Sequence, residues 1–189
     1  MKENLTAIIL AGGKSSRMKS DKALLPVRGY KLIELIINQI RGLFSEILIS
    51  SSEGEKYDFL SYPVIPDEKP GEGPLVAILS GLRASSNRIN FIIACDVPEI
   101  NITFLRKMLS YREEYDIVVP GYKDGKFEPL FGVYSKDIIP VIEKQIEDGM
   151  RNISPLFFKC HTKFIEMDDE HWYRNLNSTE DYEEYIGEK

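Results

Sequence analysis

The sequence has few of the residues on which thiol, zinc and triad chemistry depend. Its 189 residues include two cysteines, two histidines and one tryptophan. Cys95 and Cys160 show no CxxC spacing, so we expect two buried free thiols rather than a disulfide. His161 and His171 have no partners at the spacing of a zinc site. No Ser-His-Asp arrangement is evident either, so the composition gives no support to a hydrolase of that type.

Positive charge and long apolar runs are also scarce. The formal net charge is −6, which argues against a general nucleic-acid-binding protein, because phosphate contacts need a surplus of lysine and arginine. No run approaches the roughly 18 apolar residues that suffice to span a bilayer. Met1 leads into a short apolar stretch without the features of a signal peptide. We therefore expect a cytoplasmic protein that uses neither a membrane nor a nucleic acid as partner.

Short apolar segments alternate with segments of helical period through the first 120 residues. The expected strands are rich in β-branched residues and span 5–11, 47–51, 91–95 and 117–119. They show no polar alternation, as is typical of parallel strands covered on both faces. The expected helices span 31–43, 75–84 and 101–110, the last with Asn101 as N-cap. This alternation predicts an α/β fold with a mostly parallel sheet.

The pattern changes after Pro120. A turn cluster over 121–125 precedes a possible extra strand at 127–134. A helix over 137–147, a mixed segment and an acidic helix over roughly 178–186 follow. No repeat, low-complexity tract or linker divides the chain, so we expect one domain over 1–189.

A glycine-rich, basic loop follows the first expected strand. Gly12 and Gly13 let backbone N–H groups approach an anion, because no Cβ stands in the way. The single acid of residues 14–28 is Asp21, and the bases there are Lys14, Arg17, Lys19, Lys22 and Arg28. A compact basic loop in an acidic protein indicates a small phosphorylated ligand. The alternative is a tight turn bearing solvated lysines.

Two common nucleotide-binding motifs do not explain this loop. Gly13-Lys14-Ser15 is similar to the end of a P-loop, but that motif requires a glycine where the chain has Ile8. The dinucleotide motif GxGxxG is absent, since Lys14 and Arg17 occupy positions where glycines should follow. A different loop type is therefore expected.

Residues 10–29, LAGGKSSRMKSDKALLPVRG, resemble the signature LAGGxSxRMGxDKxLLxxxG of molybdenum cofactor guanylyltransferases. The resemblance covers nearly the whole chain and continues, in order, through Pro66-Asp67, Gly73-Pro74-Leu75, Cys95-Asp96-Val97-Pro98, Glu128-Pro129-Leu130 and Asn175-Leu176-Asn177-Ser178-Thr179-Glu180. The chain departs from the family at Lys19 and Ala77, where glycine is usual, and at Ser178-Thr179, where Thr-Pro is usual. The resemblance implies a three-layer, Rossmann-like nucleotidyltransferase fold with a mostly parallel central sheet.

The same resemblance implies a Mg²⁺-dependent transfer of GMP from GTP to the terminal phosphate of Mo-molybdopterin. The products would be Mo-molybdopterin guanine dinucleotide and pyrophosphate. Proteins that deliver the pterin and that mature molybdoenzymes would be further partners. Two alternatives stay open: a cytidylyltransferase acting on molybdopterin or another phosphorylated small molecule, and a nucleotide-binding regulator without turnover.

The resemblance also implies roles for individual residues. The catalytic group is Arg17, Lys22 and Asp96, with Asp96 also holding the metal. The nucleotide-binding residues are Leu10, Ala11, Gly12, Gly13, Lys22, Asp67 and Asp96. The pterin would be bound by Asn175 and Asn177, whose side-chain amides offer both donors and acceptors.

Structural explanations compete with several of these roles. Asp96 follows the expected strand 91–95, at the carboxyl edge where α/β sheets bind ligands, and its hard oxygen suits Mg²⁺. It could instead serve a turn or cap a helix, and Asp67 could equally form a turn. One of Asn175 and Asn177 could cap the last helix. Glu128 could be structural or could face the pterin.

Overall fold

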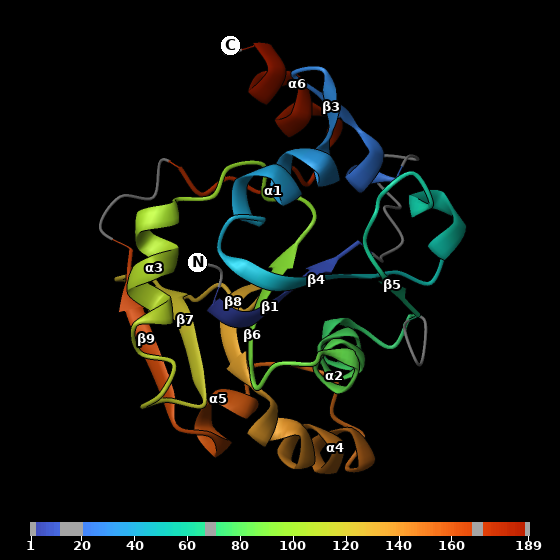
Figure 1. The fold of residues 1–189 in the computed structure, drawn as a ribbon. Helices are drawn as coiled ribbons and strands as arrows, with labels where there is room; N and C mark the ends of the chain where they lie inside the picture. Colours follow the sequence, from blue (N-terminus) through green and yellow to red (C-terminus); the bar gives the residue numbers. More distant parts are fainter. Residues whose placement is uncertain (1–2, 12–20, 67–70, 168–171, 188–189) are drawn as a thin grey trace.

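The computed structural model describes residues 3–11, 21–66, 71–167 and 172–187. Its main feature is a seven-stranded sheet (Figure 1) with the strand order β5-β4-β1-β6-β8-β7-β9. These strands are β1 (Glu3–Leu10), β4 (Phe44–Ser50), β5 (Val64–Ile65), β6 (Ile89–Ala94), β7 (Ile117–Gly121), β8 (Phe131–Ser135) and β9 (Thr162–Glu166). A small antiparallel hairpin pairs β2 (Pro26–Val27) with β3 (Tyr30–Lys31).

The described residues also form six helices and three 3-10 turns. The helices are α1 (Leu32–Ile40), α2 (Pro74–Ala84), α3 (Ile102–Leu109), α4 (Ile139–Glu147), α5 (Leu156–Lys159) and α6 (Thr179–Gly187). The turns are η1 (Lys22–Leu24), η2 (Gly54–Tyr57) and η3 (Lys136–Ile138). None of the helices in these ranges is both long and apolar enough to cross a membrane.

Strand direction follows the expected α/β pattern, with one exception. β1 pairs in parallel with β4 and with β6, and β4 pairs in parallel with β5. β8 runs antiparallel to both of its neighbours, β6 and β7, whereas β7 and β9 are parallel. The sheet is therefore mostly parallel, and β8 is the strand predicted after the turn cluster.

Helices cover both faces of the sheet and create three layers (Figure 1). Ala7 and Ile9 of β1 lie in one hydrophobic cluster, together with residues of α1 and α3. Ile8 and Leu10 lie in the other cluster, with residues of α2, α4 and α5. Successive strand residues point to opposite faces, and here both faces are apolar, so β1 reads as an unbroken apolar run.

Gly81 allows α2 to approach the sheet closely. A Cβ built on Gly81 would lie 2.8 Å from Cγ2 of Ile8, a separation that real Cβ atoms do not adopt. Glycine costs about 1 kcal/mol relative to alanine within a helix. At this position that cost is offset by close packing against the central strand.

The predicted strands and helices correspond to observed elements, whereas several short elements, including α5 and the turns η1 and η2, were not predicted. The expected strands 5–11, 47–51, 91–95 and 117–119 correspond to β1, β4, β6 and β7. The N-cap role of Asn101 is confirmed, because its side chain accepts a hydrogen bond from the Phe104 N–H at 3.0 Å. The hairpin β2–β3, the two-residue β5 and the edge strand β9 were missed. Both cysteines are free, although each is only partly buried.

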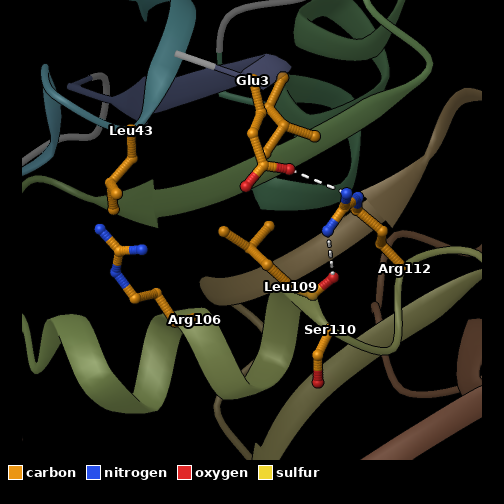
Figure 2. A pocket seen from close by; sticks show the side chains of 7 residues that line it. Glu3, Leu43, Arg106, Leu109, Ser110 and Arg112 are labelled. Atoms are coloured by element: carbon orange, nitrogen blue, oxygen red, sulfur yellow. Dashed lines mark hydrogen bonds and ion pairs between the residues drawn. The ribbon is translucent and has the colours of Figure 1, made fainter. Parts of the chain in front are cut away.

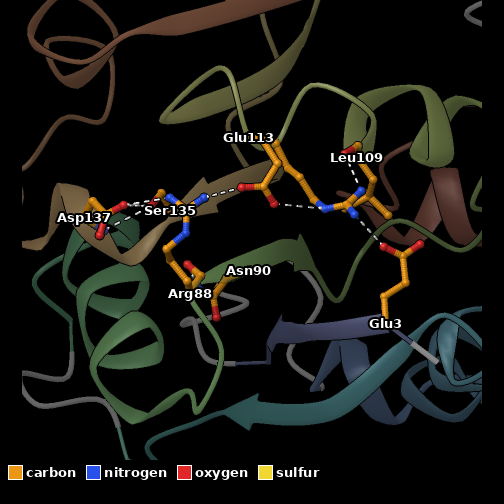
Figure 3. A network of polar contacts seen from close by, with 8 residues as sticks. Glu3, Arg88, Asn90, Leu109, Glu113, Ser135 and Asp137 are labelled. Atoms are coloured by element: carbon orange, nitrogen blue, oxygen red, sulfur yellow. Dashed lines mark hydrogen bonds and ion pairs between the residues drawn. The ribbon is translucent and has the colours of Figure 1, made fainter.

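The end of the sheet at which β1 begins carries several ion pairs. Figure 2 shows a shallow pocket there, lined by Glu3, Leu43 and residues at the end of α3. Arg112 binds Glu3 at 2.8 Å, and Arg88 binds Glu113 and Asp137 at 2.7 and 2.8 Å (Figure 3). These pairs join the start of β1 to the segments beside β6 and β8.

Candidate active site

A ligand site is expected at the opposite end of the sheet, beyond the carboxyl ends of β1 and β6. The site residues described below lie at this carboxyl edge. β1 lies between β4 and β6, so the chain leaves it toward one side and later returns on the other. In open α/β sheets, ligands bind outside the carboxyl ends of the strands at such a switch point. The ends remain in contact beyond the strands, because the Cys95 N–H donates to the Leu10 carbonyl at 3.1 Å. Leu10 and Ala11 are both buried.

Three of the predicted site residues meet at this edge. The Lys22 ammonium lies 3.3 Å from Oδ2 of Asp96. It also donates to Oδ1 of Asn177 at 3.1 Å. The Lys22 and Asp96 side chains retain 17% and 21% of their exposure, so both are accessible to a ligand yet partly shielded from water. The structure thus brings together a cation, a carboxylate and an amide from three distant segments.

Local structure fixes the position of Lys22. Asp21 precedes η1 and caps it, since its Oδ1 accepts a hydrogen bond from the Ala23 N–H at 3.1 Å. Ala23 is fully buried, which anchors the turn to the core. Lys22 therefore starts from a fixed backbone, and its side chain extends toward Asp96.

The C-terminal segment reaches the same edge through main-chain contacts. The Leu176 N–H donates to the Asp96 carbonyl at 2.9 Å, and Leu176 is buried in the core. The asparagines on either side are not the cap of α6. Ser178 is the cap, because its hydroxyl accepts from the Asp181 N–H while Asp181 accepts from the Ser178 N–H. Backbone hydrogen bonding from Ser178 is the largest cause that lowers the pKa of Asp181.

Asn175 and Asn177 differ in their surroundings. Asn177 is exposed and bonded to Lys22, as described above. Asn175 is partly buried, and its carbonyl accepts from the Asn177 N–H at 3.0 Å. Within the described part of the chain, the Asn175 side chain makes no hydrogen bond. Its amide is therefore not committed to a partner among the described residues.

Glu128 is a second carboxylate close to Asp96. Its Oε1 accepts a hydrogen bond from the Tyr122 hydroxyl at 3.0 Å, and its Oε2 accepts one from Tyr173 at 3.2 Å. Burial raises the pKa of Glu128, the two tyrosines oppose this shift, and the negative charge of Asp96 adds to it. Sequence analysis left Glu128 open and did not identify Tyr173. Glu128 thus links the turn before β8 to the segment that carries the two asparagines.

Cys95 sits next to Asp96 but is not poised for nucleophilic chemistry. Burial raises the pKa of its thiol to about 12, and the charges of Asp96 and Asp21 act in the same direction. Nucleophilic cysteines have a lowered pKa, since the thiolate is the reactive form. The functional groups of the site are therefore carboxylates, an ammonium and amides, and the thiol of Cys95 is not activated.

Several predicted residues lie outside the described part of the chain. These are Gly12, Gly13, Arg17 and Asp67. The residues that flank the first three are well placed for a ligand loop, because Ala11 follows β1 and Asp21 precedes Lys22. Their proposed roles remain predictions.

Asp96 fits a divalent cation that is shared with substrate phosphates. In the described ranges no group of three or more histidine, cysteine, aspartate or glutamate side chains could form a complete protein metal site. Mg²⁺ does not require one, because it commonly binds to one or two carboxylates, several waters and phosphate oxygens. The hard oxygens of Asp96 at the strand edge match that chemistry.

Comparison with known proteins now identifies the family. The sequence profile of the MobA-like NTP transferase domain matches residues 7–159. The chain belongs to this family. The chain is 39% identical over 191 residues to a probable molybdenum cofactor guanylyltransferase of Carboxydothermus hydrogenoformans, covering 97% of this chain and 96% of the relative. A protein of the same description from Flavobacterium johnsoniae is 34% identical and covers 95% of each chain.

Solved structures confirm the fold. Molybdopterin-guanine dinucleotide biosynthesis protein A from Archaeoglobus fulgidus superposes with a TM-score of 0.82 at 18% identity, covering 96% of this chain and 97% of that one. A protein from Aquifex aeolicus superposes with a TM-score of 0.78 at 28% identity, covering 92% and 94%. The chain therefore has the three-layer, Rossmann-like fold that the sequence resemblance implied, and its family match and curated relatives make it a nucleotidyltransferase.

Proposed function

We propose that the chain transfers GMP from GTP to the terminal phosphate of Mo-molybdopterin. The new bond joins a phosphate oxygen of the pterin cofactor to the α-phosphorus of GTP, and the bond to the β-phosphate oxygen breaks, releasing pyrophosphate. The observation that carries the proposal is the meeting of Lys22, Asp96 and Asn177 at the strand edge. Relatives at 39% and 34% identity described as guanylyltransferases support the choice of nucleotide and acceptor.

The protein's own role in this reaction is to position phosphates and neutralise charge. Lys22 can turn from Asp96 to the phosphates and neutralise phosphate charge in the transition state. A divalent cation held by Asp96, which we expect to be Mg²⁺, would neutralise charge on the α- and β-phosphates. Arg17 would assist on pyrophosphate, while Leu10, Ala11, Gly12, Gly13 and Asp67 would contact the nucleotide. No protein nucleophile is needed, because the acceptor phosphate attacks directly.

Asn175 and Asn177 are proposed to bind the pterin or its phosphate. Asn177 is exposed beside Lys22, and the amide of Asn175, two residues away, makes no hydrogen bond to the described residues. We expect the reaction to occur in the cytoplasm, between a protein that delivers molybdopterin and one that receives the finished cofactor.

A nucleotide panel tests the choice of base. GTP, CTP, ATP and UTP are each added with Mg²⁺, and the melting temperature is measured. Ligand at 100 times its dissociation constant stabilises a fold by about 2.7 kcal/mol. For a chain of this size, that corresponds to a rise of roughly 5–10 °C. GTP should give the largest rise, and a larger rise with CTP would replace the guanylyl assignment by a cytidylyl one.

Pyrophosphate release tests whether the protein turns over. With GTP, Mg²⁺ and molybdopterin, the wild type should release pyrophosphate, and Asp96→Asn should lose at least about a hundredfold in rate. Asp137→Asn is the matched control, because Asp137 pairs with Arg88 at the other end of the sheet and should keep its activity. Binding of GTP without release of pyrophosphate in the wild type would favour a regulator.

A further inference from the structure

The hydroxyl of Tyr57 contacts two residues that flank residues 12–20. It lies 3.1 Å from the Ala11 carbonyl oxygen and 3.1 Å from Oδ2 of Asp21, both of which are acceptors. A hydroxyl has one hydrogen to donate, so that hydrogen is shared between the end of β1 and the start of η1. Tyr57 is fully buried at the end of η2, which makes it a rigid point of attachment.

The two carboxylate oxygens of Asp21 make different contacts. Oδ1 caps η1 through the Ala23 N–H. Oδ2 faces the Tyr57 hydroxyl and the Lys56 ammonium, which is 3.7 Å away. The next residue is Lys22, whose ammonium reaches Asp96. A continuous set of contacts therefore runs from the core at Tyr57, through Asp21, to the cation of the site.

We infer that Tyr57 is a positioning residue for the nucleotidyl transfer, which holds Lys22 in place through Asp21. The inference rests on the proposed function for its consequence in catalysis, but its structural part concerns the protein alone. Tyr57 touches neither substrate nor the reacting atoms. Its effect passes through the backbone of η1, so it should disappear when Lys22 is absent.

The chemistry of Tyr57 suits such a role. Burial raises the pKa of its hydroxyl far above the usual range, and the Asp21 carboxylate raises it further. The hydroxyl therefore stays protonated and remains a donor wherever the protein is folded. A phenylalanine would keep the ring and the packing, and would remove only the hydrogen bond.

The catalytic test compares Tyr57→Phe with Tyr134→Phe. Tyr134 is also fully buried, and its hydroxyl donates to the Pro129 carbonyl at 2.7 Å, so it controls for the loss of a buried hydroxyl. In Tyr57→Phe, kcat/KM for GTP should fall about tenfold or more, in keeping with a misplaced catalytic group. Tyr134→Phe should change it by less than about threefold, because the Tyr134 hydroxyl bonds the Pro129 carbonyl rather than Asp21 and does not support η1.

A double variant separates positioning from general damage. In the Lys22→Ala background, Tyr57→Phe should cost less than about twofold in addition, because residues that act as a unit are not additive. A full tenfold loss in that background, or equal losses in Tyr57→Phe and Tyr134→Phe, would overturn the inference.

A nucleotide-free arm keeps the inference testable if the wild type shows no turnover with GTP. The coupling between Lys22 and Asp96 is measured by a double-mutant cycle on the free energy of unfolding, with Tyr57 intact and with Tyr57→Phe. The coupling should be present with tyrosine and lost with phenylalanine. Equal coupling in both backgrounds defeats the inference, whereas absence of turnover in the wild type defeats only the proposed function.

Discussion

Lys22 and Asp96 form an ion pair, and their partial exposure of 17% and 21% limits what this pair adds to stability. Ion pairs near the surface contribute from nothing to about 1 kcal/mol. The pair matters more for the position of the two side chains than for stability. Its value lies in keeping the ammonium beside the carboxylate at the strand edge.

Glu128 leads to a prediction about pH. Because burial raises the pKa of Glu128 in the folded protein, its ionisation disfavours folding, and this penalty grows as pH rises from the ordinary glutamate value through the raised one. Glu128→Gln removes that charge. The free energy of unfolding of Glu128→Gln, relative to that of the wild type, should therefore increase as pH rises from the ordinary glutamate pKa to the raised pKa. Above the raised pKa the difference should stay constant. After solvent screening, the gain should not exceed about 1 kcal/mol.

Glu46→Gln provides the control with the opposite sign. Burial alone raises the pKa of Glu46, but hydrogen bonds from Thr6 and Ser86 outweigh it, so the net pKa is lowered. Its stabilisation is present above the unfolded pKa and is lost as pH falls. Urea unfolding of both variants from pH 3 to pH 8 checks the pair of predictions, and parallel pH profiles would contradict them.

At the residue scale, the sequence was informative where charge or a motif marked a position. Lys22, Asp96 and Asn177 were predicted, and they meet in the structure. Tyr57 and Tyr173 belong to no motif and carry no charge. The sequence alone does not show whether a tyrosine hydroxyl is bonded to a carboxylate. Only the folded chain brings Tyr57 next to Asp21, which is 36 residues away.

At the scale of elements, the segment before α6 can be separated from the nucleotide loop. Asn175→Ala with Asn177→Ala should spare GTP affinity and weaken molybdopterin binding at least about tenfold, since hydrogen bonds to charged groups contribute roughly 1.5–3 kcal/mol each. α6 is capped by Ser178, so the double variant should also keep most of its stability. Calorimetric titration with each ligand and a melting curve measure all three quantities.

The capping alternative supplies the control for this experiment. Ser178→Ala removes the cap and should lower the melting temperature, while pterin affinity should change less than in the double asparagine variant. A double asparagine variant with normal pterin affinity and a lowered melting temperature would defeat the site assignment.

The strands differ in how clearly the sequence predicts them. β1 and β6 are buried on both faces, so their apolar runs are unmistakable. β9 is an edge strand, and of its five residues only Ile165 is buried. Its mixture of polar and apolar residues therefore resembles a loop. β5 has two residues and exists through pairing with β4, which no local pattern reveals.

At the scale of the whole molecule, the expectation that residues 1–189 form one domain remains a prediction. Leu176 and Tyr185 near the C-terminus share a hydrophobic cluster with Leu5 and Phe44. We therefore expect a single calorimetric transition in which the van't Hoff and calorimetric enthalpies agree. Two separable heat-absorption peaks would indicate more than one domain.

The sheet divides structural and chemical tasks between its two ends. Arg88 and Arg112 join acidic partners at the end where β1 begins. Lys22 and Asp96 pair at the opposite end, and their side chains are partly accessible to a ligand. The sequence predicted this second end through the rule for parallel strands, whereas the ion pairs depend on side-chain geometry that composition does not encode.

The distance along the chain between Lys22 and Asn177, 155 residues, has a consequence for synthesis on the ribosome. A nascent chain that lacks residues 173–189 already contains every strand of the described sheet, and it contains the glycine-rich loop. It still lacks the amide that meets Lys22 and the backbone N–H that meets Asp96. The amide of Asn177 and the N–H of Leu176 are therefore the last parts of this cluster to be synthesised, after every strand of the described sheet.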